Sequence, residues 1–305
     1  MRLLSKKRAM TSPRHLGLFL TLGLFWGISP SLYRHWGVLG VPVSHIIFLT
    51  GIGVAAALAA ICQLRGIDWI GGRRLHVFGI GCATLMNVPF ALGLVFARHV
   101  PPTELALIIS TAPIVNYLVA LATRRENAAP RRLLAILLGF LSTAILVITR
   151  EGMLSGAVSW WLIAAFSLPV LYSAYNFFAA SWWPHGAHPM AAGVAESTWS
   201  GLLAVPFLLL FAPPWSPDIP AASAYWTVLL ACGMWTLERI AFFTLIQEKG
   251  AVFTVQAVYL STPAAVVIAL AFYGGADIWL FVSLAVLMGA LYLNNTGSAA
   301  RPTSA

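Results

Sequence analysis

The sequence predicts an all-α membrane protein, and three observations lead to that fold class. Only 9% of its 305 residues are charged and 60% are hydrophobic, whereas a soluble domain has about 25% charged residues. The mean hydropathy is +0.85. The apolar residues also fall into ten runs, each close to the roughly 20 residues that a spanning helix needs. These features exclude a disordered chain and a water-soluble enzyme with a single core.

The ten expected spanning helices are joined by short loops. They cover approximately residues 15–34, 43–64, 75–97, 103–122, 132–149, 158–181, 189–212, 223–247, 252–273 and 277–294. Turn-forming residues mark the connections, as in Pro101-Pro102 and Gly274-Gly275. None of the loops is long enough to fold as a soluble domain, so any function must lie within the helix bundle.

The first apolar run follows a basic tail and therefore resembles a secretory signal. It is too long for one, however, and no small-x-small cleavage site follows it. We interpret it as an uncleaved first helix. Its Gly23-x-x-x-Gly27 spacing permits close helix contact, and we expect a monomer or a weak dimer.

The positions of Lys and Arg predict the orientation in the membrane. Fourteen of the 18 basic residues lie in the N-terminal tail, the C-terminal tail and the loops on the same side, while three lie in the opposite loops. The positive-inside rule then places both termini in the cytoplasm, with the chain in a bacterial inner membrane. The net charge of +9 is thus a topology signal, and we expect no nucleic-acid partner.

The cysteines predict neither a disulfide framework nor a metal site. Cys62, Cys82 and Cys232 are odd in number, lie in apolar runs and form no CxxC or Cys/His spacing. We expect no metal and no cofactor.

Ten helices with both ends on one side suggest two halves of five, which would have opposite topology. At an offset of 150 residues, Cys82 aligns with Cys232 and Pro113 with Pro263, and Ser110-Thr111-Ala112-Pro113 parallels Ser261-Thr262-Pro263. We therefore predict tails at 1–14 and 296–305 and two inverted five-helix repeats, 15–150 and 151–295, around a central cavity.

Prolines inside the expected spans predict helix kinks, because each removes a backbone hydrogen bond. Simple bundle packing is the alternative explanation for any one of them. The residues expected to kink their helices are Pro30, Pro89, Pro113, Pro169 and Pro263.

With these helices, prolines and repeated segments, the chain resembles the drug/metabolite transporter superfamily, in particular its EamA-type ten-helix branch. Trp26-Gly27 is similar to the opening Trp-Gly of that branch, and the stretch from Arg98 to Glu126 resembles its signature of helices 3 and 4. Two departures matter: the second half lacks the closing Glu, and helix 8 carries Glu238-Arg239. In length and topology the chain is most similar to amino-acid exporters of the YddG kind. The resemblance implies a cavity lined by helices 1, 3, 4, 6, 8 and 9 that works by alternating access.

Three ionisable residues, Glu196, Glu238 and Arg239, lie deep in the expected spans, where a charge costs about 2.5–3.5 kcal/mol on insertion scales. In the functional interpretation, Arg239 binds a carboxylate, Glu238 meets an ammonium group and Trp235 supplies an apolar wall, which together suit a zwitterion. In the structural alternative, the charges close ion pairs or cap a broken helix. Glu196 either pairs with Arg239 or, like Glu238, is a protonatable coupling site.

Polar and aromatic residues at helical spacing on the other spans predict the rest of the cavity lining. Taken singly, each is more often interhelical glue than a ligand contact. The complete set of expected substrate-binding residues is Trp26, Ser29, Asn87, Asn116, Tyr117, Tyr172, Tyr175, Asn176, Trp235, Glu238, Arg239, Gln256 and Tyr259.

The sequence therefore predicts a secondary transporter that exports amino acids, aromatic or other neutral ones, or similar small metabolites by alternating access. It does not predict an enzyme, because no protease motif or Asp-rich cluster occurs in the spans. An intramembrane enzyme and a non-catalytic membrane subunit are the alternatives. The expected partners are a zwitterionic amino acid and the lipid bilayer.

Overall fold

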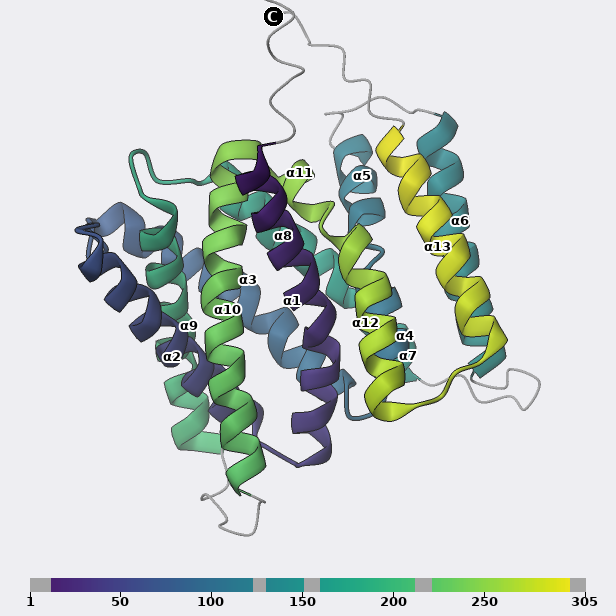
Figure 1. Cartoon of the computed structure of the whole chain (residues 1–305), viewed down its shortest axis with the longest axis horizontal. Coiled ribbons are helices and arrows are strands. Elements are labelled where there is room, and N and C mark those ends of the chain that lie inside the picture. Colours follow the sequence, from purple (N-terminus) through teal and green to yellow (C-terminus); the bar gives the residue numbers. More distant parts are fainter. Residues whose placement is uncertain (1–11, 123–129, 151–159, 212–220, 297–305) are drawn as a thin grey trace, which may run out of the picture.

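The part of the chain that the structure describes is helical throughout. This computed structural model describes residues 12–122, 130–150, 160–211 and 221–296, and within them it contains thirteen helices and no strand (Figure 1). Seven of the ten predicted spans are single helices, and three are each broken into two. The predicted all-helical class is thus confirmed for these residues.

The single helices match the predicted runs within a few residues at most ends. They are α1 (Pro13–Val38), α2 (Val43–Leu64), α3 (Arg73–Phe96), α6 (Pro130–Arg150), α9 (Pro189–Phe211), α10 (Ala221–Lys249) and α13 (Ile278–Thr296). The helix α10 extends two residues past each predicted end, and Gly250, with φ of 83°, then reverses the chain. A side chain at that φ would be strained, so glycine suits this turn.

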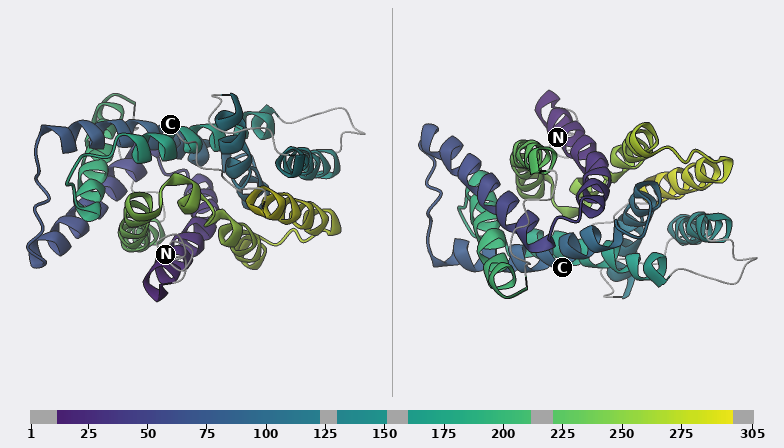
Figure 2. Two further views of the ribbon diagram at one scale, coloured as in Figure 1. Left: turned by 90° about the horizontal axis from the view of Figure 1, so that it is seen from above. Right: turned by 90° about the horizontal axis from the view of Figure 1, so that it is seen from below.

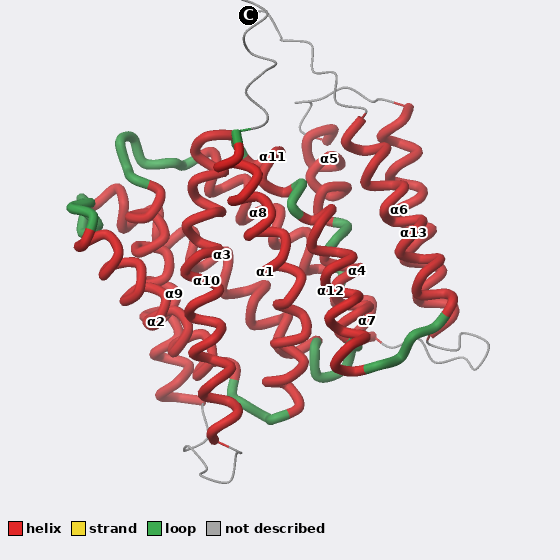
Figure 3. The backbone as a smooth tube through the Cα atoms, viewed as in Figure 1, coloured by secondary structure: helices red, strands yellow, loops and turns green. Residues whose placement is uncertain are grey.

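The remaining three spans are broken inside the bundle. They are α4 (Pro102–Ile109) with α5 (Ala112–Ala122), α7 (Trp160–Ala165) with α8 (Ser167–Ser181), and α11 (Ala251–Val255) with α12 (Val258–Tyr273). Loops in the described residues otherwise run over the two ends of the bundle (Figure 3). Each break leaves backbone groups outside the helical hydrogen-bond pattern at membrane depth, which requires protein or a wet cavity beside it.

The predicted kinks coincide only partly with these breaks. Pro113 and Pro169 lie in the first turn after a break, where the missing N–H has no intrahelical partner to lose. Pro263, in contrast, lies inside α12, several residues beyond the break at Gln256 and Ala257. Pro30 and Pro89 lie inside the unbroken helices α1 and α3.

The surface of the bundle is apolar over many helices. Eight helical stretches of the described residues are long and apolar enough to cross a membrane, and Leu133–Ser142 and Ile278–Leu293 are shorter apolar helices. Large side chains such as Leu209, Leu210 and Phe272 are 74–79% exposed. Apolar surface on this scale needs lipid around it, and the chain is accordingly a multi-pass membrane protein.

Small residues allow several helices to approach closely. A Cβ built on Gly51 of α2 would lie 2.6 Å from the backbone nitrogen of Gly201 in α9. The Gly23-x-x-x-Gly27 face of α1 packs against α12 within the chain, where a Cβ on Gly27 would lie 2.9 Å from the Cβ of Ala264. Seen along the helices, α6 and α13 form a pair at one edge, and α2 lies at the opposite edge (Figure 2).

Candidate functional site

A cavity lies in the middle of the bundle. Its walls come from α1, α3, α4, α8 and α10 together with residues of α5, α11 and α12. The space open to the centre of a water molecule is about 120 Å³. Since one water needs roughly 10–15 Å³ on this measure, the cavity has room for about ten waters, or for a small organic solute that displaces them.

Two carboxylates share one guanidinium at the cavity. Arg239 Nη1 lies 2.9 Å from Glu238 Oε2, and Arg239 Nε lies 3.4 Å from Glu196 Oε2. The three side chains are only 13%, 4% and 1% exposed, in that order. Glu238 and Arg239 are adjacent on α10, and the long Arg239 side chain folds back to its neighbour. The structure thus pairs Arg239 with both deep carboxylates, Glu196 and Glu238.

Uncharged side chains also donate hydrogen bonds to these two carboxylates. Trp26 Nε1 donates to Glu238 Oε1 over 2.9 Å, and the Tyr175 hydroxyl donates to Glu196 Oε2 over 3.1 Å. Glu196 Oε1 is buried and has no hydrogen-bond partner among the described residues. The cluster formed by Glu196, Glu238 and Arg239, here called the ion cluster, is thus held by residues of α1 and α8 as well as α10.

Aromatic rings form most of the remaining wall. Tyr175 stacks on Phe242 with ring centres 5.2 Å apart, and Trp26 approaches the same Phe242 ring. The ring centre of Phe90 lies 5.2 Å from that of Trp235 and 5.4 Å from that of Tyr33. These rings give the cavity large flat apolar surfaces of the kind that bind amphipathic solutes.

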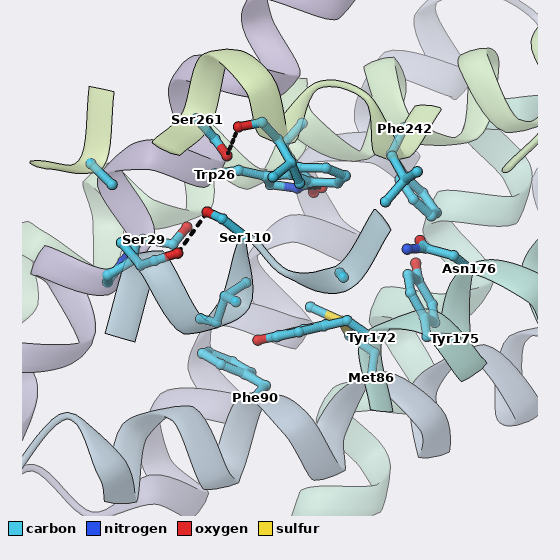
Figure 4. A pocket seen from close by; sticks show the side chains of 18 of the residues that line it. Trp26, Ser29, Met86, Phe90, Ser110, Tyr172, Tyr175, Asn176, Phe242 and Ser261 are labelled. Atoms are coloured by element: carbon cyan, nitrogen blue, oxygen red, sulfur yellow. Dashed lines mark hydrogen bonds between the residues drawn. The ribbon is translucent and has the colours of Figure 1, made fainter. Parts of the chain in front are cut away.

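Hydroxyl groups line the side of the cavity that lies opposite Tyr175 and Phe242. Figure 4 shows Ser29, Ser110 and Ser261 gathered on one side, with Tyr175, Asn176 and Phe242 on the other. Ser110 lies at the break between α4 and α5, and its hydroxyl donates to the carbonyl of Ala106. The broken helix therefore places a polar group beside the cavity.

The structure brings eight predicted binding residues together around this cavity. They are Trp26, Ser29, Tyr172, Tyr175, Asn176, Trp235, Glu238 and Arg239. Pro30 also lines it.

Five other predicted binding residues do not line the cavity. Asn87 exchanges hydrogen bonds with Ser200 of α9. Tyr117 packs with Ile136 of α6 in a separate apolar cluster. The Tyr259 hydroxyl donates to the backbone of Leu291 in α13. Asn116 is buried within α5, and Gln256 caps the end of α11. The side chains of Asn87, Tyr117 and Tyr259 thus contact a neighbouring helix instead of the cavity.

Glu196 opens onto a second, smaller chamber. Its other lining residues are Thr50, Gly51, Val54, Met86, Phe90, Ser197, Ser200, Trp235 and Arg239. Four of these residues, Met86, Phe90, Trp235 and Arg239, also line the main cavity. The two spaces are therefore neighbours on either side of the Arg239 side chain.

Several lining residues were absent from the predicted set. They are Tyr33, Met86, Phe90, Ser110, Phe242 and Ser261, together with small or aliphatic residues. Helical spacing places three of them on the predicted stripes, since Tyr33 lies seven residues after Trp26, Phe90 three after Asn87 and Phe242 four after Glu238. Met86 has no such signal, and Ser110 and Ser261 occur in the repeated Ser-Thr segments.

Comparisons with known proteins inform the fold alone. No family model matches the sequence, and no curated protein matches it. Sixteen chains of solved structures match. One of them, described only as "Crystal structure of protein", superposes with a TM-score of 0.64 over 94% of this chain and 98% of that chain, at 18% sequence identity. Nearly the whole helical bundle thus has a counterpart of known structure.

Proposed function

We propose that the chain is a secondary transporter that moves small zwitterionic solutes, neutral amino acids above all, across the bacterial inner membrane by alternating access. The observation that carries this proposal is the central cavity: it combines a buried ion cluster with aromatic walls and a row of hydroxyls. Charged groups at this depth cost several kcal/mol, so they are rare in spanning helices and commonly mark a solute or ion pathway. Aromatic rings beside charges of both signs suit a solute with an ammonium, a carboxylate and an apolar side chain.

Helix packing supports ten spans arranged as two inverted repeats, 15–150 and 151–295. Under this assignment α9 corresponds to α2, α10 to α3 and α13 to α6. The pair α3 and α9 then has its counterpart in α10 and α2, and both pairs are in contact. The helices α2 and α9, and likewise α6 and α13, are contacts between counterparts. Two halves related by a twofold axis produce this pattern.

Contacts between the corresponding helices support the same axis. Gly51 abuts Gly201, its equivalent at the offset of 150 residues. The Ser142 hydroxyl donates to the Ser283 carbonyl, and the Ser283 hydroxyl donates to the Ser142 carbonyl, each over 2.8 Å. Such reciprocal bonds are typical of residues that lie beside a twofold axis. We therefore propose membership of the EamA-type branch of the drug/metabolite transporters.

Counterflow in proteoliposomes tests the function directly. Vesicles containing the purified protein and unlabelled phenylalanine are diluted into labelled phenylalanine, and transient uptake of label is followed. We expect accumulation above that of protein-free vesicles. A panel of twenty amino acids as internal solutes then ranks the substrates. Absence of counterflow with every amino acid would reject amino-acid transport, and the enzyme and subunit alternatives would then be tested.

Variants of the ion cluster connect transport to the cavity. Glu238→Gln removes a charge that would meet the substrate's ammonium, and we expect KM for phenylalanine to rise about tenfold or more, the equivalent of 1.4 kcal/mol of lost binding. Glu248→Gln is the matched control, because Glu248 lies in the last turn of α10 and pairs with Arg14 outside the cavity. Equal KM values in the two variants would remove Glu238 from the site.

A further inference from the structure

We infer that Glu196 binds one proton in the transport cycle, and that protonation of Glu196 releases Arg239 to bind the substrate's carboxylate. This inference rests on the proposed function and adds to it the coupling ion and the group that binds it. It also explains how Arg239 can receive a substrate although the structure shows it held by two carboxylates.

The charges of the ion cluster do not balance. With Glu196 and Glu238 ionised, two negative charges face the single positive charge of Arg239, and all three groups are buried. A net charge of −1 in a low-dielectric interior favours the uptake of one positive charge. Arrival of a zwitterion, with one charge of each sign, leaves the same imbalance. The substrate itself therefore cannot supply the missing positive charge, and one additional cation has to accompany it.

The contacts of the two carboxylates select Glu196 as the group that takes up this charge. Glu238 uses both oxygens, one toward Arg239 and the other toward Trp26. Glu196 uses only Oε2, which accepts from Tyr175 and faces Arg239 at the longer distance of 3.4 Å. Its Oε1 is buried without a partner in the described residues. An ionised oxygen in that position lacks compensation, whereas a protonated one carries no charge.

No other charged group near Glu196 offsets its charge. Tyr175 of α8, Cys82 of α3, and Glu238 and Arg239 of α10 are the ionisable groups that act on it or on which it acts. The helix α2 contributes Thr50, Gly51 and Val54 to the chamber, none of which is ionisable. Only Arg239 among these groups is positive, and Glu238 already binds it at the shorter distance.

The chamber beside Glu196 suits a proton better than a metal cation. Glu196 supplies the one carboxylate of the chamber lining, and the other side-chain oxygens there are the neutral hydroxyls of Thr50, Ser197 and Ser200, whereas a metal cation favours several carboxylate ligands. The Arg239 guanidinium also lines the chamber, and it would repel a second full positive charge. A proton instead becomes part of the carboxyl group and leaves it neutral.

The coupling follows from competition for Arg239. A hydronium ion transfers a proton to the Glu196 carboxylate: one O–H bond of the hydronium ion breaks, the O–H bond of a neutral carboxylic acid forms, and a water molecule is left. Neutral Glu196 no longer holds Arg239 by charge, so the guanidinium can turn to the substrate's carboxylate while Glu238 receives the ammonium. Substrate and proton consequently bind together and leave together, one of each per cycle.

Proton movement is measured with a pH-sensitive dye trapped in proteoliposomes that contain phenylalanine at equal internal and external pH. The membrane potential is clamped with potassium and valinomycin in sodium-free buffer. For the wild-type protein we expect phenylalanine efflux to raise the internal pH. An unchanged internal pH during efflux, a fall in pH, or a requirement for sodium would overturn the inference. These measurements need no variant and stay decisive if a variant fails to fold.

Glu196→Gln separates coupling from transport. The amide oxygen can still accept from Tyr175 but cannot hold a proton, and it resembles the neutral acid. We expect the number of protons that leave per phenylalanine during efflux to fall to near zero, measured against the counterflow rate of the same variant. Glu248→Gln is again the control and should keep the wild-type ratio. A folded Glu196→Gln protein that moves phenylalanine and still moves protons with it would contradict the role of Glu196.

The two proposals fail in different ways. If wild-type vesicles show no counterflow with any amino acid, the proposed function itself is wrong. If counterflow is present but no proton moves with the substrate, the proposed transport function is retained and the proposed proton binding by Glu196 is rejected.

Discussion

Arg239 is the residue on which the stability of the cavity depends most. Its guanidinium is the one positive charge in contact with Glu196 and Glu238 among the residues that the structure describes. Removing one member of a buried ion pair typically costs about 3–5 kcal/mol, because the partner charge is left uncompensated. Truncation of Arg239 would leave two carboxylates, those of Glu196 and Glu238, without a compensating positive charge.

Arg239→Ala should therefore destabilise the fold as well as impair transport. We expect unfolding in detergent, followed by tryptophan fluorescence, to shift to clearly lower temperature. The combined variant Glu196→Gln, Glu238→Gln and Arg239→Met should regain most of the loss, since neutral groups of similar size replace the charges. A combined variant as unstable as Arg239→Ala would show that lost packing, rather than uncompensated charge, is the cause.

The sequence predicts the ion cluster by its members but not by its pairing. Deep charges are rare enough that Glu196, Glu238 and Arg239 stand out on cost alone. Which atoms meet depends on the rotamer of a long side chain and on how α9 lies against α10, and neither is encoded in spacing. Asn87 and Tyr259 illustrate the same limit, since both lie on polar stripes but the neighbouring helix, rather than the cavity, receives them.

At the scale of elements, the apolar runs predict every helix that the structure describes, while the breaks inside three of the predicted spans are not predicted. At the break between α4 and α5, Ser110 and Thr111 turn their hydroxyls back onto carbonyls of the preceding turn, which offers the backbone an alternative to the helix. The same residue types occur in unbroken helices, where Thr50 of α2 bonds back in the same way. Local sequence thus permits a break, and tertiary packing decides where one occurs.

The backbones of α2 and α9 approach so closely that a single methyl group tests the contact. Gly51→Ala would place a Cβ 2.6 Å from the backbone of Gly201, and Gly201→Ala would meet Ile52 at 2.8 Å. Overpacking of this kind costs about 1–3 kcal/mol, so we expect either variant to lower the unfolding temperature.

Gly233→Ala supplies the control for this test. Gly233 is an exposed residue of α10, and a Cβ there meets no atom within 4 Å. The substitution should leave stability unchanged or raise it by up to about 1 kcal/mol, because alanine favours helix over glycine. If Gly51→Ala behaves like Gly233→Ala, the two helices are not in backbone contact in the membrane.

On the scale of the whole molecule, the orientation is the prediction most open to direct test. The loop between α2 and α3 and the loop between α12 and α13 lie at opposite ends of the bundle (Figure 1). Ile70 and Ala276 are exposed residues of these loops. Single cysteines at the two positions, in a protein whose three native cysteines are replaced, report the side on which each loop lies.

The positive-inside rule predicts different labelling of the two cysteines. In intact cells, a membrane-impermeant maleimide should label Ala276→Cys and not Ile70→Cys. After permeabilisation it should label both. Labelling of Ile70→Cys alone in intact cells would invert the molecule, and equal labelling would contradict a fixed orientation.

The contact through Gly23 and Gly27 restricts how such a protein can change shape. Their missing side chains let α1 touch the backbone of α12, with no methyl-sized gap between the two helices. Neither helix can rotate about its own axis without driving a side chain into its partner. We therefore expect α1 and α12 to tilt together as one rigid unit. An opening to the central cavity would then form beside this helix pair, and not between α1 and α12.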